Sequence, residues 1–424
     1  MPLRLIRFAL ALLLLPTVGA AVLGLWWIER DASLSAAAAT EPFIATPQQV
    51  EHGAYLARAG NCATCHTTRG GAPYAGGVGI ATPFGTVFSS NLTPDEATGL
   101  GLWSAADFWR ALHHGRSRDG HRLYPAFPYT SYTLVSRSDS DALFAYLRSL
   151  TSVSRPNQPH TLSFLYRSQA ALAVWRALFF KPGALESGFN KSAGWNRGAY
   201  LVRGLGHCAE CHAERNMLGA TKAPLELRGG LIPLQKWYAP SLTMSHEAGV
   251  APGDVEQTLA LLKTGVAAGR SAMGPMAEVV YRSTQYLSDA DLRAMVVYLK
   301  DLPPNAPETV HSIVDKPQQF SDGEKVYSRH CAECHGEQGQ GAQGAYAPLA
   351  GNRAVLLTNP ANLVQAILNG GYPPATQGNP RPYGMPPFRQ TLNDAEIAAV
   401  LTYIRLAWGN AAQPVTVLDV LQHQ

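Results

Sequence analysis

Three copies of one five-residue motif constrain this chain more than any other feature. They are Cys62-Ala63-Thr64-Cys65-His66, Cys208-Ala209-Glu210-Cys211-His212 and Cys331-Ala332-Glu333-Cys334-His335. C-x-x-C-H is the attachment signature of c-type haem, in which two thiols one helical turn apart bond covalently to the haem and the histidine becomes the proximal iron ligand. All six cysteines belong to these motifs. We therefore predict three covalently bound haem c groups, attached through Cys62, Cys65, Cys208, Cys211, Cys331 and Cys334, with His66, His212 and His335 as iron ligands.

Two other uses of C-x-x-C fit the sequence less well. A thioredoxin-like redox site needs one such pair and no histidine after it. A structural zinc site would join two pairs around one metal, and three pairs would leave one without a partner.

Length and composition agree with several small haem domains. The 424 residues predict about three domains, as many as the motifs. The chain is 46% hydrophobic and 15% charged, with 39 glycines and 30 prolines, which is typical of compact domains with much loop. The formal net charge of +4 is too small to indicate a nucleic-acid partner, and we expect none.

The N-terminus carries an export segment that permits two interpretations. After Arg4 and Arg7, residues 8–28 contain no charge. A signal peptide could be cleaved after the small residues 18–20. The uncharged run continues beyond them, however, and its 21 residues would cross a bilayer as a retained anchor with two tryptophans at the outer end. We favour the anchor, and either form places the rest of the chain on the periplasmic side of a bacterial cytoplasmic membrane.

The motifs lie in three similar helical units. A glycine precedes the first cysteine by nine, ten and eight residues, at Gly53, Gly198 and Gly323. Each unit ends in an amphipathic helix after a Ser/Asn-Asp cap, expected over residues 139–150, 289–302 and 394–408, with Tyr146, Tyr298 and Tyr403 near the middle. We predict that the glycine lets the tyrosine-bearing helix approach closely, so that the two helices cross beside each haem.

This pattern predicts a mainly α chain in which three tandem domains follow an N-terminal membrane anchor or signal segment. The expected boundaries are 1–30 for the anchor or signal, 31–47 for a tether, 48–150 for domain one, 151–193 for a linker with an amphipathic helix, 194–302 for domain two, 303–317 for a Pro-rich linker, 318–411 for domain three and 412–424 for a tail.

The chain resembles class I cytochrome c domains and, more closely, the triple-haem cytochrome c subunits of membrane-bound periplasmic dehydrogenases, which oxidise alcohols, sugar acids or aldehydes. The stretches that carry the resemblance are Thr82-Pro83-Phe84-Gly85-Thr86, Leu123-Tyr124-Pro125-Ala126-Phe127-Pro128-Tyr129, Trp195-Asn196-Arg197-Gly198-Ala199-Tyr200-Leu201, Gly274-Pro275-Met276-Ala277-Glu278 and Pro382-Tyr383-Gly384-Met385-Pro386-Pro387. The resemblance implies a non-catalytic electron-transfer subunit. Its implied partners are a catalytic dehydrogenase subunit of molybdenum, flavin or quinoprotein type, and ubiquinone or a terminal oxidase as electron acceptor.

The methionines supply candidate sixth ligands for two of the haems. Met385 is the only methionine of domain three and lies in a Pro-rich loop. In domain two, the Gly-Pro-Met pattern of the resembling family indicates Met276, with Met273 as the alternative. Met244 comes too early in the domain, and Met295 lies in the closing helix, where a core role is expected. A methionine ligand raises the haem potential.

Domain one contains no methionine, and the aligned position is Phe127. The first haem is then five-coordinate, water-ligated or bound by a histidine from among His113, His114 and His121, unless all three are surface residues. We expect a lower potential for this haem than for the other two. The Phe127 form is similar to subunits that serve molybdenum-dependent aldehyde or N-heterocycle dehydrogenases, and flavin or quinoprotein partners stay open.

The linker and the competing functions leave further alternatives. The apolar and aromatic residues 162–180, with Arg167 and Arg176, predict either a helix packed between haem domains or a basic amphipathic helix that rests on lipid or on the catalytic subunit. The alternatives to an electron-transfer subunit are a multihaem peroxidase-like enzyme, with an open first haem, and a free-standing carrier for a terminal oxidase.

Overall fold

The computed structural model describes residues 19, 43–186, 188, 190–251, 253–304 and 318–424. The candidate anchor, except for Gly19, most of the tether and nearly all of the 303–317 linker lie outside the described residues. Within those ranges, no helix has both the length and the hydropathy to cross a bilayer. The chain divides into two compact units, which comprise residues up to Gly53 with 75–80 and 84–184, and residues 54–74 with 81–83 and 185–424.

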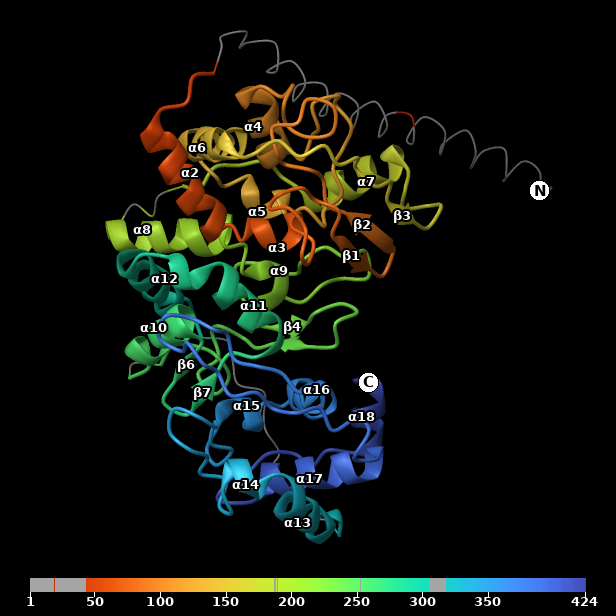
Figure 1. Ribbon diagram of the computed structural model, residues 1–424, viewed down its shortest axis with the longest axis vertical. Helices are drawn as coiled ribbons and strands as arrows, with labels where there is room; N and C mark the ends of the chain where they lie inside the picture. Colours follow the sequence, from red (N-terminus) through yellow and green to blue (C-terminus); the bar gives the residue numbers. More distant parts are fainter. Residues whose placement is uncertain (1–18, 20–42, 187, 189, 252, 305–317) are drawn as a thin grey trace, which may run out of the picture. The chain divides into compact units, whose positions relative to one another are not determined.

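The first unit is built on helices, with a small sheet. Its elements are the start of α2 (Pro47–Ala59), then α4 (Ala105–His114), α5 (Tyr129–Tyr132), α6 (Arg137–Ser149) and α7 (Gln169–Phe179) (Figure 1). Strands β1 (Gly79–Thr82), β2 (Gly85–Phe88) and β3 (Thr161–Leu162) form a sheet in that order, in which β2 pairs antiparallel with β3. Phe108 of α4 packs on Phe144 of α6 with ring centroids 5.5 Å apart.

The second unit contains all three motifs. Its helices are α3 (Cys62–His66), α8 (Ala193–Tyr200), α9 (Ala209–His212), α10 (Val255–Thr264), α11 (Gly274–Arg282), α12 (Asp289–Asp301), α13 (Gln319–His330), α14 (Ala332–His335), α15 (Arg353–Leu356), α16 (Ala361–Asn369), α17 (Asp394–Leu406) and α18 (Val417–Gln422). A π-helix over Leu201–Leu205 continues α8, and a 3-10 turn spans Thr284–Tyr286. Two short hairpins join β4 (Gly230–Leu231) to β5 (Tyr238–Ala239) and β6 (Val266–Ala267) to β7 (Arg270–Ser271). The prediction of a mainly helical chain is confirmed.

The predicted close approach of helix and glycine occurs three times. A Cβ built on Gly53, Gly198 or Gly323 would lie 1.9, 1.9 or 2.0 Å from the carbonyl oxygen of Ala142, Ala294 or Ala399. The same Cβ would lie 2.8, 2.9 and 2.9 Å from the Cβ atoms of Tyr146, Tyr298 and Tyr403. Contacts below 3.0 Å leave no room for a side chain, so only glycine permits these crossings.

Two of the three closing helices begin at the predicted residue, α12 at Asp289 and α17 at Asp394, whereas α6 begins at Arg137, two residues before its predicted start, because Ser136 caps it. The side chains of Ser136, Ser288 and Asn393 accept hydrogen bonds from the first turns of α6, α12 and α17. These bonds satisfy backbone N–H groups that the helix itself leaves without partners. The helices end one or two residues before the predicted bounds, at Ser149, Asp301 and Leu406.

Two segments differ from expectation. The helix predicted within residues 162–180 begins only at Gln169, because the Ser168 side chain caps it there by accepting from Ala171 N–H. The tail after Ala411, for which the sequence predicts no structure, carries α18. Its Val415 and Val420 are completely buried against α17, so the tail forms part of the third core.

Candidate haem-binding sites

The histidines of the second and third motifs have the orientation that a proximal iron ligand needs. His212 Nδ1 lies 2.7 Å from the carbonyl oxygen of Pro240, and His335 Nδ1 lies 2.9 Å from that of Ala347. A carbonyl only accepts, so Nδ1 donates and the Nε2 lone pair remains for a metal. Burial lowers the pKa of both histidines, which keeps them neutral. A hydrogen bond of this kind fixes the ring orientation of metal-binding histidines.

The first thiol of each motif stands at a helix start, and none of the six thiols forms a disulfide. Cys208 and Cys331 are the residues before α9 and α14, and Cys62 opens α3. Burial raises the pKa of the Cys62 and Cys208 thiols to about 12 and that of Cys331 to about 11. Such thiols stay protonated near neutral pH, unlike the thiolates of redox-active C-x-x-C sites. The thiol–histidine sets therefore fit covalent haem c.

The first motif packs against the second repeat, within the second unit. Ala59, just before α3, belongs to the buried cluster that also contains Leu201 and Met295. Burial raises the pKa of the Cys211 thiol, and Cys65 is among the groups that add to this shift. A Cβ built on Gly60, two residues before the first cysteine, would lie 3.6 Å from Leu205 Cδ2, so the first motif lies near the second repeat. His66 is half-buried at the end of α3.

Hydrogen bonds hold α2, the helix before the first motif, to the second repeat. Tyr55 donates to Asp291 over 2.6 Å, and Arg197 binds the same carboxylate through two bonds of 2.8 Å. Burial raises the pKa of Tyr55, and the Asp291 carboxylate adds to the shift. Beside this network, the Arg58 guanidinium lies 3.9 Å from the ring centroid of Tyr286.

The two candidate methionine ligands lie on neighbouring segments. Met276 is in the first turn of α11, and Met385 pairs with Gly371 through two backbone hydrogen bonds of 3.0 and 2.8 Å. Met385 also packs against the third core, and Met295 is buried in the second, as predicted. A Cβ built on Gly371 would lie 3.5 Å from Met273 Cε. Met273 therefore lies beside Gly371, in the loop of the third repeat.

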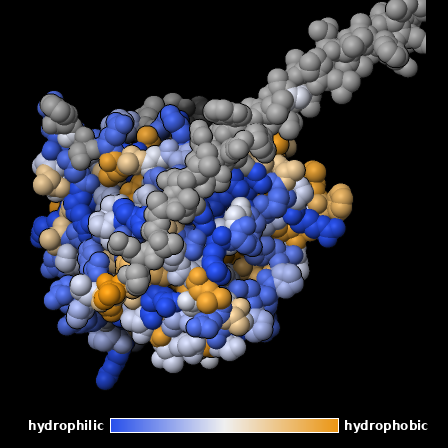
Figure 2. Space-filling model, turned by 90° about the horizontal axis from the view of Figure 1, so that it is seen from above, coloured by the Kyte–Doolittle hydropathy of each residue, from blue (hydrophilic) through white to orange (hydrophobic). Residues whose placement is uncertain are grey.

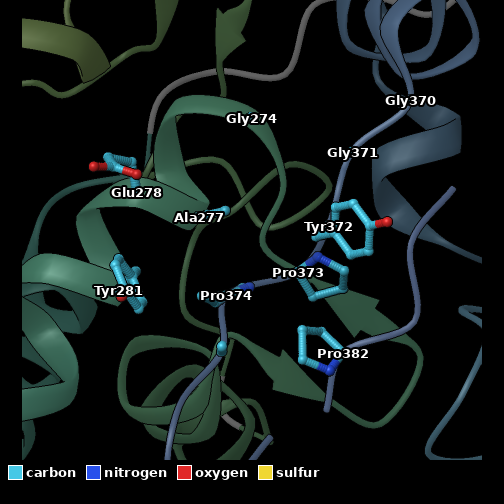
Figure 3. Close-up of a pocket in the computed structure, with 11 residues that line it drawn as sticks. Gly274, Ala277, Glu278, Tyr281, Gly370, Gly371, Tyr372, Pro373, Pro374 and Pro382 are labelled. Atoms are coloured by element: carbon cyan, nitrogen blue, oxygen red, sulfur yellow. The ribbon is translucent and has the colours of Figure 1, made fainter. Parts of the chain in front are cut away.

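A pocket of about 450 Å³ lies between α11 and the loop that leads to Met385. Figure 3 shows Glu278 and Tyr281 on the helix, with Tyr372, Pro373 and Pro382 on the loop. Nearby, Thr376 Oγ1 donates to the Thr264 carbonyl over 2.9 Å. The pocket is thus bounded by both methionine-bearing repeats.

The histidines considered for the first haem have different environments. His121 is half-exposed and pairs with Asp119 over 2.5 Å. His113 stacks on Trp109 and meets His114 edge to face, with centroids 4.2 and 4.6 Å apart. Burial lowers the pKa of His113, and that of His114 to about 4. His121 is therefore a surface residue, whereas His113 and His114 are partly buried and neutral.

The sequence does not identify the acceptors of the two histidine bonds, which are the carbonyls of Pro240 and Ala347. Both are backbone carbonyls, which any residue supplies, and they lie 28 and 12 residues after their histidines. The one local signal is a proline, at Pro240 itself and at Pro348 after Ala347, because proline restricts the backbone around it.

Comparisons with known proteins find cytochrome c relatives along most of the chain. A family model described as cytochrome c matches residues 50–151, and one described as cytochrome C oxidase, cbb3-type, subunit III matches residues 318–404. The chain is 36% identical to the cytochrome c subunit of alcohol dehydrogenase (quinone) from Gluconacetobacter polyoxogenes, over 88% of this chain and 83% of that protein. It is 36% identical to the gluconate 2-dehydrogenase cytochrome c subunit of Pantoea cypripedii, over 88% of each chain.

A third relative is similar over an even larger part of this chain. It is the fructose dehydrogenase cytochrome subunit of Gluconobacter japonicus, 34% identical over 90% of this chain and 84% of that protein. All three matches extend over most of both chains, with 392, 398 and 416 residues compared. The chain belongs to the family of cytochrome c subunits of dehydrogenase complexes.

Proposed function

We propose that the chain is the electron-transfer subunit of a membrane-bound periplasmic dehydrogenase complex. It takes electrons from a catalytic subunit that oxidises an alcohol, a sugar acid or an aldehyde, and passes them to ubiquinone or a terminal oxidase. The observation that carries the proposal is the repeated set of two thiols and an oriented histidine in a chain whose relatives are dehydrogenase cytochrome subunits.

Each motif is proposed to bind one haem c, within three tandem class I cytochrome c domains over residues 48–150, 194–302 and 318–411. The glycine–tyrosine helix crossing supports this division, because it recurs with the same geometry in each range. When bound, haem c supplies one-electron redox chemistry of iron. The cysteines would hold the group, and His212 and His335, oriented by the carbonyls of Pro240 and Ala347, would be its ligands.

Met276 and Met385 are the proposed sixth ligands of the second and third haems. Both are partly buried, and Met385 has its backbone fixed by Gly371. Phe127 has no donor atom for iron, so the first haem is expected at the lowest potential. Near-infrared magnetic circular dichroism of the oxidised protein should show two methionine–iron bands. Three such bands would contradict this ligand assignment.

The pocket beside α11 is the proposed approach for a small electron acceptor such as ubiquinone. Two tyrosines and several prolines give it apolar walls, and Glu278 places a carboxylate at its edge. Ligand sites commonly combine apolar walls with a few polar groups. Tyr372→Ala should raise the quinone concentration needed for half-maximal turnover, whereas Tyr286→Ala, at an exposed tyrosine outside the pocket lining, should not.

Purification of the complex from membranes in mild detergent tests the whole proposal. A large substrate-oxidising chain should co-purify, and substrate should reduce the haems. The pyridine haemochrome assay should give three haem c per chain, and two after Cys62→Ala with Cys65→Ala. A stable solitary protein would favour the free carrier, and peroxide turnover by the isolated subunit would favour the peroxidase-like enzyme.

The proposed location is the periplasmic side of the bacterial cytoplasmic membrane. The support is the uncharged run at residues 8–28, behind two arginines. Intact-mass measurement of the mature chain distinguishes the two forms of this segment. A mass that includes residues 1–20 indicates a retained anchor, and their loss indicates a cleaved signal peptide.

A further inference from the structure

We propose that one apolar face in the first unit rests on the surface of a lipid bilayer. It comprises Val174 and Leu178 of α7 together with Phe164 and Leu165 of the turn before the helix, and we call it the α7 face. Their exposed fractions are 81%, 65%, 50% and 63%. This inference rests on the proposed location at the membrane, and it adds which surface of the protein contacts lipid.

The orientation of α7 follows from what the helix buries. Its buried residues are Leu172 and Arg176, which stand one turn apart and face inward. The Arg176 guanidinium lies 5.1 Å from the ring centroid of Tyr129 and 4.8 Å from that of Phe180. Positions two residues away from an inward residue lie on the opposite side of a helix. Val174 and Leu178 are therefore held outward.

The other long helices of the first unit have the usual orientation. Helix α4 buries Phe108 and Leu112, and α6 buries four apolar side chains of residues 143–147. Helix α7 instead buries an arginine and exposes a valine and a leucine. Figure 2 shows hydrophobic residues gathered at the right-hand margin of the surface, the side on which Figure 1 places β3 and α7. An exposed apolar face of this kind indicates an interaction surface.

The charges around the face favour lipid over other occupants. Between Asp141 and Glu186 the sequence contains no carboxylate. Exposed Arg167 precedes α7 and exposed Lys181 follows it. Helices that lie in a membrane interface combine an apolar face with flanking cations, which bind anionic headgroups. The chemistry of the α7 face thus matches a bilayer that contains anionic phospholipid.

The course of the chain places the same unit near the membrane. The uncharged run ends at Ile28, and the first unit's described chain begins at Phe43. The 14 residues between them reach at most about 50 Å when fully extended. With residues 8–28 in the bilayer, the unit that carries α7 cannot leave its vicinity.

A spin label on the α7 face measures its depth directly. The full chain with Val174→Cys is labelled and reconstituted into vesicles of phosphatidylethanolamine and phosphatidylglycerol. Oxygen and nickel-chelate relaxation should place the label about 5–10 Å inside the headgroup boundary, as for interfacial helices. Val297→Cys is the matched control, because Val297 is also a helical valine, with 46% exposure. Its label should remain aqueous.

The charge contribution has a separate measurement. Arg167→Glu with Lys181→Glu should move the Val174 label outward on these vesicles, and should have no effect on vesicles of phosphatidylcholine alone. An aqueous Val174 label on protein that floats with the vesicles would overturn the inference. A label immobilised only after the catalytic subunit is added would also overturn it, in favour of a protein partner.

Two further readouts separate the possible failures. Protein that does not float with vesicles would contradict the proposed location itself, whatever the label reports. Wild-type protein tests the same contact without a substitution, by crosslinking to phospholipid with a diazirine in its acyl chain. Crosslinks should map to residues 164–181. Crosslinks confined to residues before Phe43 would overturn the inference.

Discussion

The second and third repeats share the glycine–tyrosine helix crossing, but different segments complete their hydrophobic cores. Both have the glycine crossing, at Gly198 and Gly323, and both orient the motif histidine with a backbone carbonyl. The third repeat closes its core with its own tail, through Val415 and Val420. The second includes Ala59, which precedes the first motif.

The second and third repeats also differ at the position two residues after the tyrosine of the closing helix. Two residues after Tyr403, Arg405 is 1% exposed and donates to the carbonyls of Val355, Leu357 and Gln413 over 2.7–2.8 Å. The equivalent residue after Tyr298 is Lys300, which is exposed. The same helix crossing thus accompanies the motif in both repeats. Each repeat then depends on whichever segment covers its core, its own tail or a neighbour's helix.

The largest expected effect on stability comes from disrupting the helix crossing that the repeats share. In Gly198→Ala the new Cβ would lie 1.9 Å from the Ala294 carbonyl oxygen, so α8 and α12 must separate. We expect a loss above about 4 kcal/mol, as for severe core overpacking. The measurement is thermal unfolding of the purified protein, together with its haem content. Gly194→Ala on the same helix is the control, because its nearest neighbour is 3.9 Å away. Equal stability of the two variants would contradict the claim that the crossing requires glycine.

The next largest effect on stability should distinguish the third repeat, with its buried arginine, from the second, which has an exposed lysine at the equivalent position. Arg405→Gln removes a buried cation and leaves three carbonyls without their donor. We expect a loss of about 3 kcal/mol, roughly 1 kcal/mol for each carbonyl. Lys300→Gln in the second repeat should change stability by less than about 0.5 kcal/mol, because the side chain is exposed. Urea unfolding checks both variants, and a comparable loss at Lys300 would remove the distinction between the repeats.

The features that the two repeats share could be predicted from the sequence, whereas the segments that complete their cores could not. Motif ligands, the glycine–tyrosine crossings and the capped closing helices follow from residue type at fixed spacing, since each needs a thiol, an imidazole, a missing Cβ or a cap. The contribution of Ala59 to the second core and of Val415 to the third had no such signal. An apolar residue is compatible with many neighbours, and only the fold selects one.

The start of α7 is likewise decided by a single local residue. Residues 162–180 are largely apolar, and that composition alone predicts a longer helix. Ser168 supplies the cap that decides where the helix begins. Arg176 faces inward onto aromatic rings, against the usual preference of a charged side chain for solvent. Its burial depends on Tyr129 and Phe180, which the sequence does not identify as its neighbours.

The smallest effect concerns the bond between the second and third repeats. Asp254, from the second, pairs with Arg270 over 3.0 Å and with Arg353 of the third over 2.6 Å. Burial opposes ionisation of this carboxyl, but the two guanidinium groups hold its pKa below the ordinary value. Asp254→Asn should cost about 2 kcal/mol near neutral pH, in the range of hydrogen bonds to charged groups. Glu256→Gln, at an exposed pair with Arg293, should cost much less, because solvent screens that pair.

The stabilisation by Asp254 should depend on pH and should be lost in acid. A carboxyl with a lowered pKa in the folded state stabilises the fold fully above its unfolded pKa of about 3.9. The stabilisation is lost as the pH falls through the lower folded value, because the protonated carboxyl no longer attracts Arg353. The difference in urea midpoint between wild type and Asp254→Asn should therefore be constant from pH 7 to about pH 5 and shrink below about pH 4. A difference that persists unchanged into acid would mean that packing, and not the ion pairs, joins the second repeat to the third.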